Sequence, residues 1–219
     1  MNSFPRWGAG AGTARMLGCL TILLLTMPAR PALALYEHVR DGWVAGIGVG
    51  FSKAKITAGS LGNHFETDWE EGTTPRLRLG HMLGKRAMLG YEQFQWVDEQ
   101  GYGDASVRVS MQTFGAALTY FPGKPKSETG GIYLRAGAGL SIARLAVSPH
   151  AIGGVDSTHT EDHVDEGGTA YMVGGGYEFR VAKPCAIALD VTANYHTVGK
   201  EFFDKAWFIP VTLGLNWYF

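Results

Sequence analysis

The last fourteen residues, 206–219, constrain the fold most, because their apolar and polar side chains alternate with a period of two. Successive Cβ atoms of a β-strand point to opposite faces, so this alternation predicts a strand. One face is apolar and carries Trp207, Ile209, Val211, Leu213, Leu215, Trp217 and Phe219. The other face is small, polar or mixed and carries Phe208, Pro210, Thr212, Gly214, Asn216 and Tyr218. A strand with aromatic residues at both ends of its apolar face is typical of a transmembrane β-barrel.

The end of the chain also resembles the C-terminal signal of bacterial outer-membrane β-barrel proteins. Gly214, Trp217 and Phe219 match the glycine, the aromatic residue and the terminal phenylalanine of that signal. The resemblance implies that the barrel-assembly machinery reads this segment and is a partner of the chain. A barrel also requires an export signal and further strands of the same kind, even in number.

The N-terminus has the pattern of a secretory signal peptide. Arg6 and Arg15 form a basic region, residues 16–27 are apolar, and residues 32–34 read Ala-Leu-Ala, a cleavage site of the A-x-A type. The alternative is an N-terminal membrane anchor, but twelve apolar residues fall short of the roughly 20 that a spanning helix needs. We therefore expect residues 1–34 to be removed and residues 35–219 to form the barrel domain.

Charge and cysteine content narrow the function of the mature chain. Cleavage after Ala34 leaves 16 basic and 20 acidic residues, so nucleic acid is not an expected partner. Cys185 is then the single thiol, which leaves no internal disulfide. Glycine, with 31 residues, is abundant without a collagen-like period.

Eight alternating segments predict an all-β, eight-stranded antiparallel up-and-down transmembrane barrel. The expected strands are 43–52, 75–83, 87–97, 105–121, 131–145, 168–180, 186–198 and 206–219. Tight turns are expected at 84–86, 122–129 and 181–185, and loops at 53–73, 98–104, 146–167 and 199–205. A bulge is expected after Gln93, where the alternation weakens. Short turns face the periplasm in such barrels, so both termini are expected there.

The inward face is predicted to carry charges and most of the glycines, while the outward face is aliphatic and aromatic. The predicted lumenal charge network consists of Arg76, Arg78, Glu92, Arg108, Arg135, Glu178 and Asp190. In strand 105–121 this assignment places Val107, Val109 and Met111 outward, opposite Arg108. A soluble barrel of the lipocalin or avidin type is the alternative, and it would have to bury Trp43, Trp207 and Trp217.

With eight strands placed, the mature chain resembles the small eight-stranded outer-membrane barrels. This group includes the transmembrane domain of outer-membrane protein A and the opacity-type surface proteins. The resemblance implies an integral protein of a Gram-negative outer membrane that contacts outer-membrane lipids, with a structural or surface-interaction role. We expect no enzymatic activity and no cofactor. Loops 53–73 and 146–167 are the expected contacts for an extracellular ligand.

Two groups of residues raise other chemistry. Loop 146–167 contains His150, Asp156, His159, Glu161, Asp162, His163, Asp165 and Glu166. His159 and His163 would suit zinc if this loop formed a helical turn, but a solvated acidic loop is the favoured interpretation and no metal is predicted.

The second group surrounds His196. Some eight-stranded barrels are lipid A-modifying hydrolases with a motif like His-x-Ser-Asn. The segment around His196 lacks that serine, so His196 is expected to be a hydrogen-bonded lumenal residue.

The lumenal charges leave two interpretations open. A paired, buried network would plug the barrel, because an unpaired charge in a low-dielectric interior costs several kcal/mol. The alternative is a water-filled, weakly anion-selective channel for small solutes. The plugged barrel is the predicted state.

Overall fold

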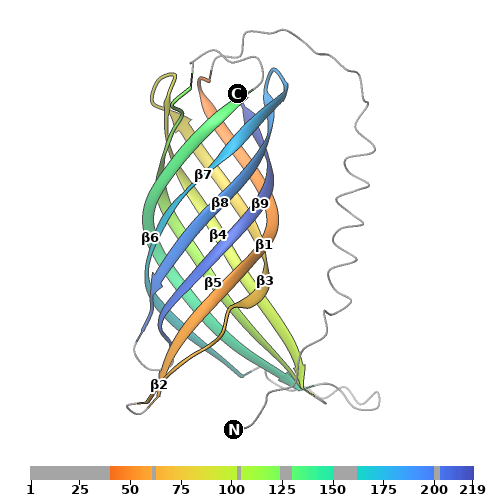
Figure 1. Cartoon of the computed structure of the whole chain (residues 1–219), viewed down its shortest axis with the longest axis vertical. Coiled ribbons are helices and arrows are strands. Elements are labelled where there is room, and N and C mark those ends of the chain that lie inside the picture. The colour runs from red at the N-terminus through yellow and green to blue at the C-terminus, as the bar shows by residue number, and fades with distance from the viewer. Residues whose placement is uncertain (1–39, 61–62, 103–104, 124–129, 150–161, 200–202) are drawn as a thin grey trace. The chain divides into compact units, whose positions relative to one another are not determined.

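A computed structural model describes residues 40–60, 63–102, 105–123, 130–149, 162–199 and 203–219 (Figure 1). The described residues form antiparallel strands in one sheet. The strands are β1 (Trp43–Ser60), β2 (Asn63–Glu66), β3 (Glu70–Met82), β4 (Ala87–Tyr102), β5 (Ala105–Tyr120), β6 (Gly130–Pro149), β7 (Asp162–Ala182), β8 (Cys185–Thr197) and β9 (Phe203–Tyr218). Strand β1 pairs with both β3 and β9, so the sheet closes into a barrel of eight strands. The short strand β2 pairs with the end of β1 and is not part of the closed wall. The predicted fold class is confirmed.

The seam between β1 and β9 holds the two ends of the barrel domain together. Trp43 N donates a hydrogen bond to Phe219 O at 2.7 Å, and Phe219 N donates to Trp43 O at 3.0 Å. Gly42 precedes this pair with φ of 71°, a left-handed conformation that suits glycine. The turns at Gly84 and Pro184 lie at the same end as Phe219, because Met82 N donates to Gly42 O at 2.9 Å and Tyr218 N donates to Pro184 O at 2.7 Å. We call this end the turn end. The opposite end, where β2 lies, is the loop end.

Strand lengths correct the predicted loops. Segment 53–73 is mostly strand, because β1 runs to Ser60, β2 follows and β3 begins at Glu70. Segment 98–104 lies largely within β4, and β6 and β7 extend into segment 146–167. A transmembrane strand needs about 9–11 residues, whereas β6 has 20 and β7 has 21. The described outward residues of these extensions include the exposed charges Lys53, Glu71 and Asp165, and this polarity is why the extensions resemble loops in the sequence.

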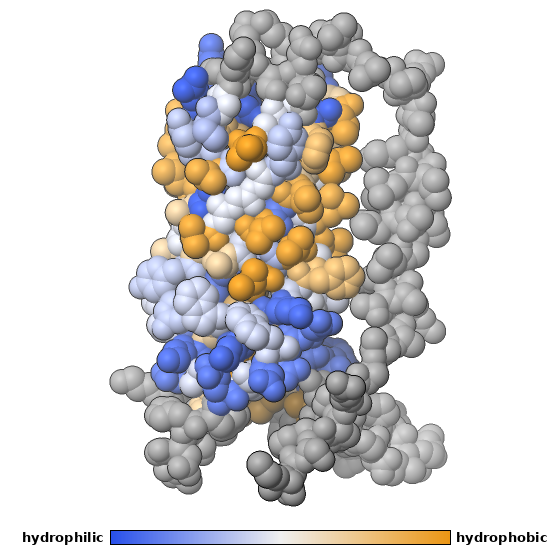
Figure 2. All heavy atoms as spheres, in the orientation of Figure 1, coloured by the Kyte–Doolittle hydropathy of each residue, from blue (hydrophilic) through white to orange (hydrophobic). Residues whose placement is uncertain are grey.

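The outer wall is apolar along most of the barrel. Figure 2 shows hydrophobic residues over the wall and a hydrophilic belt at the loop end. Trp207 and Trp217 are ten residues apart on β9 and are 45% and 47% exposed, so they mark two aromatic boundaries of a membrane-sized band. The part of the chain that the structure describes contains no helix with the length and hydropathy of a membrane span.

Two local predictions in β4 and β5 are wrong. The pairing of β4 with β5 is continuous from Ala87 to Tyr102, without the bulge expected after Gln93. Phe94 and Trp96 keep the inward parity of Glu92 and are buried. In β5 the predicted faces are reversed, because Met111 is fully buried while Arg108 is 57% exposed at its side chain. Near the loop end the lumen is apolar, so apolar residues there face inward.

Candidate functional site

The middle of the lumen contains a central charge network of three arginines and two carboxylates. Its members are Arg76 and Arg78 from β3, Glu92 from β4, Arg135 from β6 and Asp190 from β8, and all are buried. Glycines leave room for these long side chains: a Cβ at Gly48 would lie 3.5 Å from Arg76 Nε, and one at Gly214 would lie 3.0 Å from Arg76 Nη2. Alternation along each strand therefore builds the network.

Glu92 links two of the arginines. Arg78 Nε donates to Glu92 Oε1 at 2.8 Å, and Arg135 Nη1 lies 2.9 Å from Glu92 Oε2. On the far side of the bore, Asp190 pairs with Arg76 and accepts a hydrogen bond from the Tyr133 hydroxyl. Charge-assisted hydrogen bonds of this kind are about twice as strong as neutral ones.

The network crosses the lumen from wall to wall. The closed barrel has the strand order β1-β3-β4-β5-β6-β7-β8-β9, in which β4 and β8 are four strands apart in either direction. Glu92 and Asp190 therefore come from opposite walls of the barrel. Arg78 and Arg135 bridge them, since their Nη2 atoms lie 3.8 Å and 3.4 Å from Asp190 Oδ1. The two carboxylates and their arginines thus occupy the bore at this level.

A second charged cluster closes the turn end. Glu178 accepts a hydrogen bond from the Tyr218 hydroxyl at 2.5 Å and lies 3.6 Å from Arg180 Nη2. Arg40, which precedes β1, reaches Glu178 Oε2 at 3.9 Å and stacks on Phe121 with its guanidinium carbon 4.3 Å from the ring centroid. Glu178 therefore belongs to this cluster and not to the central network. Sequence analysis missed Arg40, which lies outside every predicted strand.

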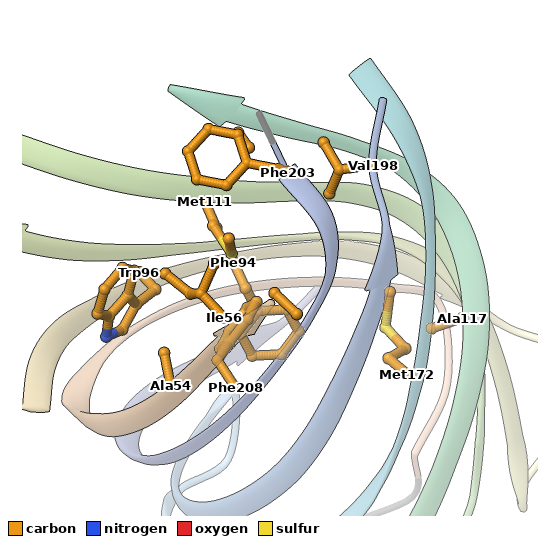
Figure 3. Close-up of a cluster of buried hydrophobic side chains, with 12 residues drawn as sticks. Ala54, Ile56, Phe94, Trp96, Met111, Ala117, Met172, Val198, Phe203 and Phe208 are labelled. Atoms are coloured by element: carbon orange, nitrogen blue, oxygen red, sulfur yellow. The ribbon is translucent and has the colours of Figure 1, made fainter. Parts of the chain in front are cut away.

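The lumen near the loop end is filled by apolar side chains (Figure 3). This apolar cluster consists of Ala54, Ile56, Phe94, Trp96, Met111, Ala117, Ala143, Met172, Val198, Phe203, Ala206 and Phe208. Such a layer excludes water from the part of the barrel that the charges do not fill.

Arg108 is the one predicted member of the lumenal network that the structure places outside. It donates to Glu99 through Nη2 at 2.7 Å in an exposed ion pair on the outer wall. Arg144 and Asp165 form a similar exposed pair at 2.6 Å on β6 and β7. These pairs belong to the hydrophilic belt and are worth little to stability.

His196 is buried in the lumen, as predicted. Its Nε2 lies 3.0 Å from Thr113 Oγ1, and its Nδ1 contacts Ser141 Oγ. The Ser141–His196 contact has the atoms of a hydrolase pair, but the second ring nitrogen meets a hydroxyl in place of the carboxylate that orients a catalytic histidine. The Phe208 ring packs on the imidazole ring of His196, with 5.0 Å between their centroids. Thr113 and Ser141 are both buried. The arrangement suits hydrogen-bonded packing.

Loop 146–167, for which metal binding was the less favoured interpretation, lies mostly outside the described residues. His150, Asp156, His159 and Glu161 fall there, while His163 lies in strand β7 and not in a helical turn. Asp165 pairs with Arg144, and Glu166 accepts a hydrogen bond from Phe203 N at 2.9 Å. Among the described residues, no group of three or more His, Cys, Asp or Glu side chains is arranged to hold a metal ion.

The residues of the C-terminal signal have clear positions. Gly214 faces the lumen beneath Arg76, where a side chain would collide with Ile47 O at 2.8 Å. Trp217 and Phe219 face outward, and Phe219 is 67% exposed. Recognition by the assembly machinery stays a prediction.

Comparisons with known proteins give structural matches only. No protein-family model matches the sequence, and no curated protein matches it. The attachment invasion locus protein Ail of Yersinia pestis, solved with the heparin analogue sucrose octasulfate, is 11% identical, with a TM-score of 0.53 and coverage of 81% of this chain and 99% of that chain. Neisserial surface protein A is 16% identical, with a TM-score of 0.51 and coverage of 81% and 97%. At this identity the likeness concerns the fold.

Proposed function

We propose that this protein, an outer-membrane β-barrel of the small eight-stranded type, has a structural or surface-interacting role and keeps its lumen closed to ions. The observation that carries the proposal is the central charge network, in which Arg78 and Arg135 join carboxylates from opposite walls. Opening a path through this level requires separating buried ion pairs, which is costly in a low-dielectric interior. The barrel then works through its outer surface and its loop end.

Three stacked layers support a closed bore. The cluster around Glu178 lies at the turn end, the central network lies in the middle, and the apolar cluster lies towards the loop end. An eight-stranded barrel has an interior just wide enough for side chains to fill. An ion would have to displace side chains at each layer.

Absence of enzymatic activity is part of the proposal. The Ser141–His196 contact is the nearest approach to a catalytic pair, and it is buried beside Thr113 and Phe208. A hydrolase acting on lipid needs its nucleophile at a surface that substrate reaches. The expected partners are outer-membrane lipids, the barrel-assembly machinery and an extracellular ligand at the loop end.

A small-solute channel is the second candidate, and one observation favours it. Arg76 Nε and Arg135 Nε are buried without a hydrogen-bond acceptor among the described residues, and water in the lumen would satisfy them. Three arginines face two carboxylates in the central network, so an opened lumen would prefer anions. Planar-bilayer recording of the purified, refolded protein separates the two candidates. We expect no sustained single-channel steps from the unmutated protein and transient steps from Glu92→Ala or Asp190→Ala. Sustained conductance from the unmutated protein would replace the closed barrel with a channel.

A further inference from the structure

Three glutamines lie on the outer wall of the barrel where β4 meets β5. Glu92 and Phe94 of β4 point inward and are buried, so Gln93 and Gln95 take the outer face. Gln95 pairs in register with Gln112 of β5, and directly opposed residues share a face of the sheet. All three side chains are partly exposed. We call Gln93, Gln95 and Gln112 the glutamine patch.

Gln93 lies close to the middle of the membrane-spanning part of β4. It is six residues from Ala87, where β4 begins at the turn end, and six residues from Glu99, whose exposed pair with Arg108 marks the hydrophilic belt. A rise of about 3.3 Å per residue along a strand tilted by about 45° gives about 14 Å in each direction. The apolar band of such a barrel is about 25 Å tall, so the Gln93 amide lies at the depth of the lipid tails.

Other strands carry apolar residues at this depth. Val211 lies between the boundary residues Trp207 and Trp217 of β9, Val191 of β8 pairs with it in register, and both valines are exposed. Lipid tails neither donate nor accept hydrogen bonds, so an amide among them costs free energy that a valine does not. The alternation of β4 therefore weakens after Gln93 because polar residues occupy its lipid face, while its pairing with β5 stays continuous.

The glutamine patch has few hydrogen-bond partners on its own barrel. The Tyr91 hydroxyl donates to Gln93 Oε1 at 3.3 Å, and this is the one side-chain hydrogen bond of the patch in the described part of the chain. Each glutamine amide offers two N–H donors as well as an acceptor oxygen. The donors of the patch therefore need acceptors from outside the barrel.

A second copy of the chain supplies both donors and acceptors. Because an amide donates and accepts, two patches related by a two-fold axis can exchange N–H···O bonds in both directions. The patch carries no charge, so the two copies do not repel each other there. Beside the patch, Ala116 of β5 pairs with Tyr91 on one side and with Ala138 of β6 on the other. The two alanines are exposed and short, so a second wall can approach closely.

We propose that two copies of this barrel associate in the plane of the membrane through the glutamine patch. The amides of one copy bond to the amides of its partner, and the alanines pack at the interface. This association goes beyond the proposed function, because it requires the barrel but neither a closed lumen nor a ligand at the loop end.

Sedimentation equilibrium of the folded protein, in non-ionic micelles matched in density to the solvent, measures the association directly. We expect a reversible dimer of the unmutated protein. Its dissociation constant should rise about tenfold in Gln93→Leu, and further in the double variant Gln93→Leu/Gln95→Leu, because a hydrogen bond between side chains within the membrane contributes about this factor. Val191→Leu is the matched control, since it also places a leucine on the outer wall, but on β8, four strands away from β4. It should leave the dissociation constant unchanged.

Urea unfolding of the dilute, monomeric protein tests whether the glutamines serve the single barrel instead. Gln93→Leu should unfold at the same urea concentration as the unmutated protein or at a higher one, because leucine suits the lipid face better than an amide. Three outcomes would each overturn the proposal: a monomer at every ratio of protein to micelle, a dimer that the double variant does not weaken, or equal weakening by Val191→Leu. A Gln93→Leu monomer that unfolds at lower urea would also overturn it, since the amide would then stabilise its own barrel.

Discussion

Replacing Glu92 by Gln removes the charge that links two buried arginines. The side chain is fully buried and contacts Arg78 at 2.8 Å and Arg135 at 2.9 Å. After the change, Asp190 is the one carboxylate left in the central network, at 3.8 Å and 3.4 Å from the same guanidinium groups. Breaking a buried pair costs about 3–5 kcal/mol, and because Asp190 retains part of the attraction we expect about 3 kcal/mol.

Urea unfolding in lipid vesicles, followed by tryptophan fluorescence, measures this loss in free energy of unfolding. About 3 kcal/mol corresponds to roughly a hundredfold change in the equilibrium constant. Glu99→Gln is the control, because its pair with Arg108 is exposed and should be worth at most about 1 kcal/mol.

A double variant tests the electrostatic reasoning directly. Arg78→Met in the Glu92→Gln background removes one of the stranded cations, so the double variant should lose less stability than the sum of the two single variants. Additive losses, or a Glu92→Gln loss no greater than that of Glu99→Gln, would refute the argument that these charges depend on each other.

Three further predictions concern other parts of the barrel. Gly214→Val should lower the free energy of unfolding by about 1–3 kcal/mol, because its Cβ would lie 2.8 Å from the backbone oxygen of Ile47; an unchanged urea midpoint would contradict this. Deleting Phe219 should reduce the amount of barrel inserted in the outer membrane more than Trp69→Ala, an exposed aromatic outside the strands; equal levels in membrane fractions would argue against the signal. The raised pKa of Glu70 means that its charged form is disfavoured in the folded state, so Glu70→Gln should be at least as stable as the unmutated protein at pH 7, with the difference shrinking as the pH falls towards 4.5; a less stable variant at pH 7 would count against it.

The charged lumen was predictable because its charged residues alternate along each strand with apolar residues that take the opposite face. Arg76 and Arg78 alternate with Leu77 and Leu79, and only one parity keeps the leucines in lipid. The same rule failed in β5, where Met111 faces inward. The rule assumes that apolar side chains meet lipid, and the apolar cluster at the loop end breaks that assumption. No single strand of the sequence reveals this cluster, since its members come from several strands.

The partners of each charge were beyond sequence reasoning. Glu178 could be assigned to the lumen from its parity, but its contact with Arg40 involves a residue that precedes β1 and belongs to no alternating segment. The Ser141–His196 contact joins residues of β6 and β8 that no local motif connects. Alternation predicts which face a residue takes, whereas the stagger of the strands decides which residues meet.

The central charge network also bears on the order in which the barrel is made. Arg76 and Arg78 lie in β3, whereas Asp190 lies in β8, near the end of the chain. A partly inserted sheet that lacks β8 would hold three guanidinium groups against the single carboxylate of Glu92, facing lipid or an open groove. A guanidinium group in hydrocarbon is expensive, so an intermediate of this kind cannot rest in the bilayer unaided. The last strands therefore neutralise the interior as well as close the hydrogen-bonded wall, and insertion and closure are expected to be a single concerted event.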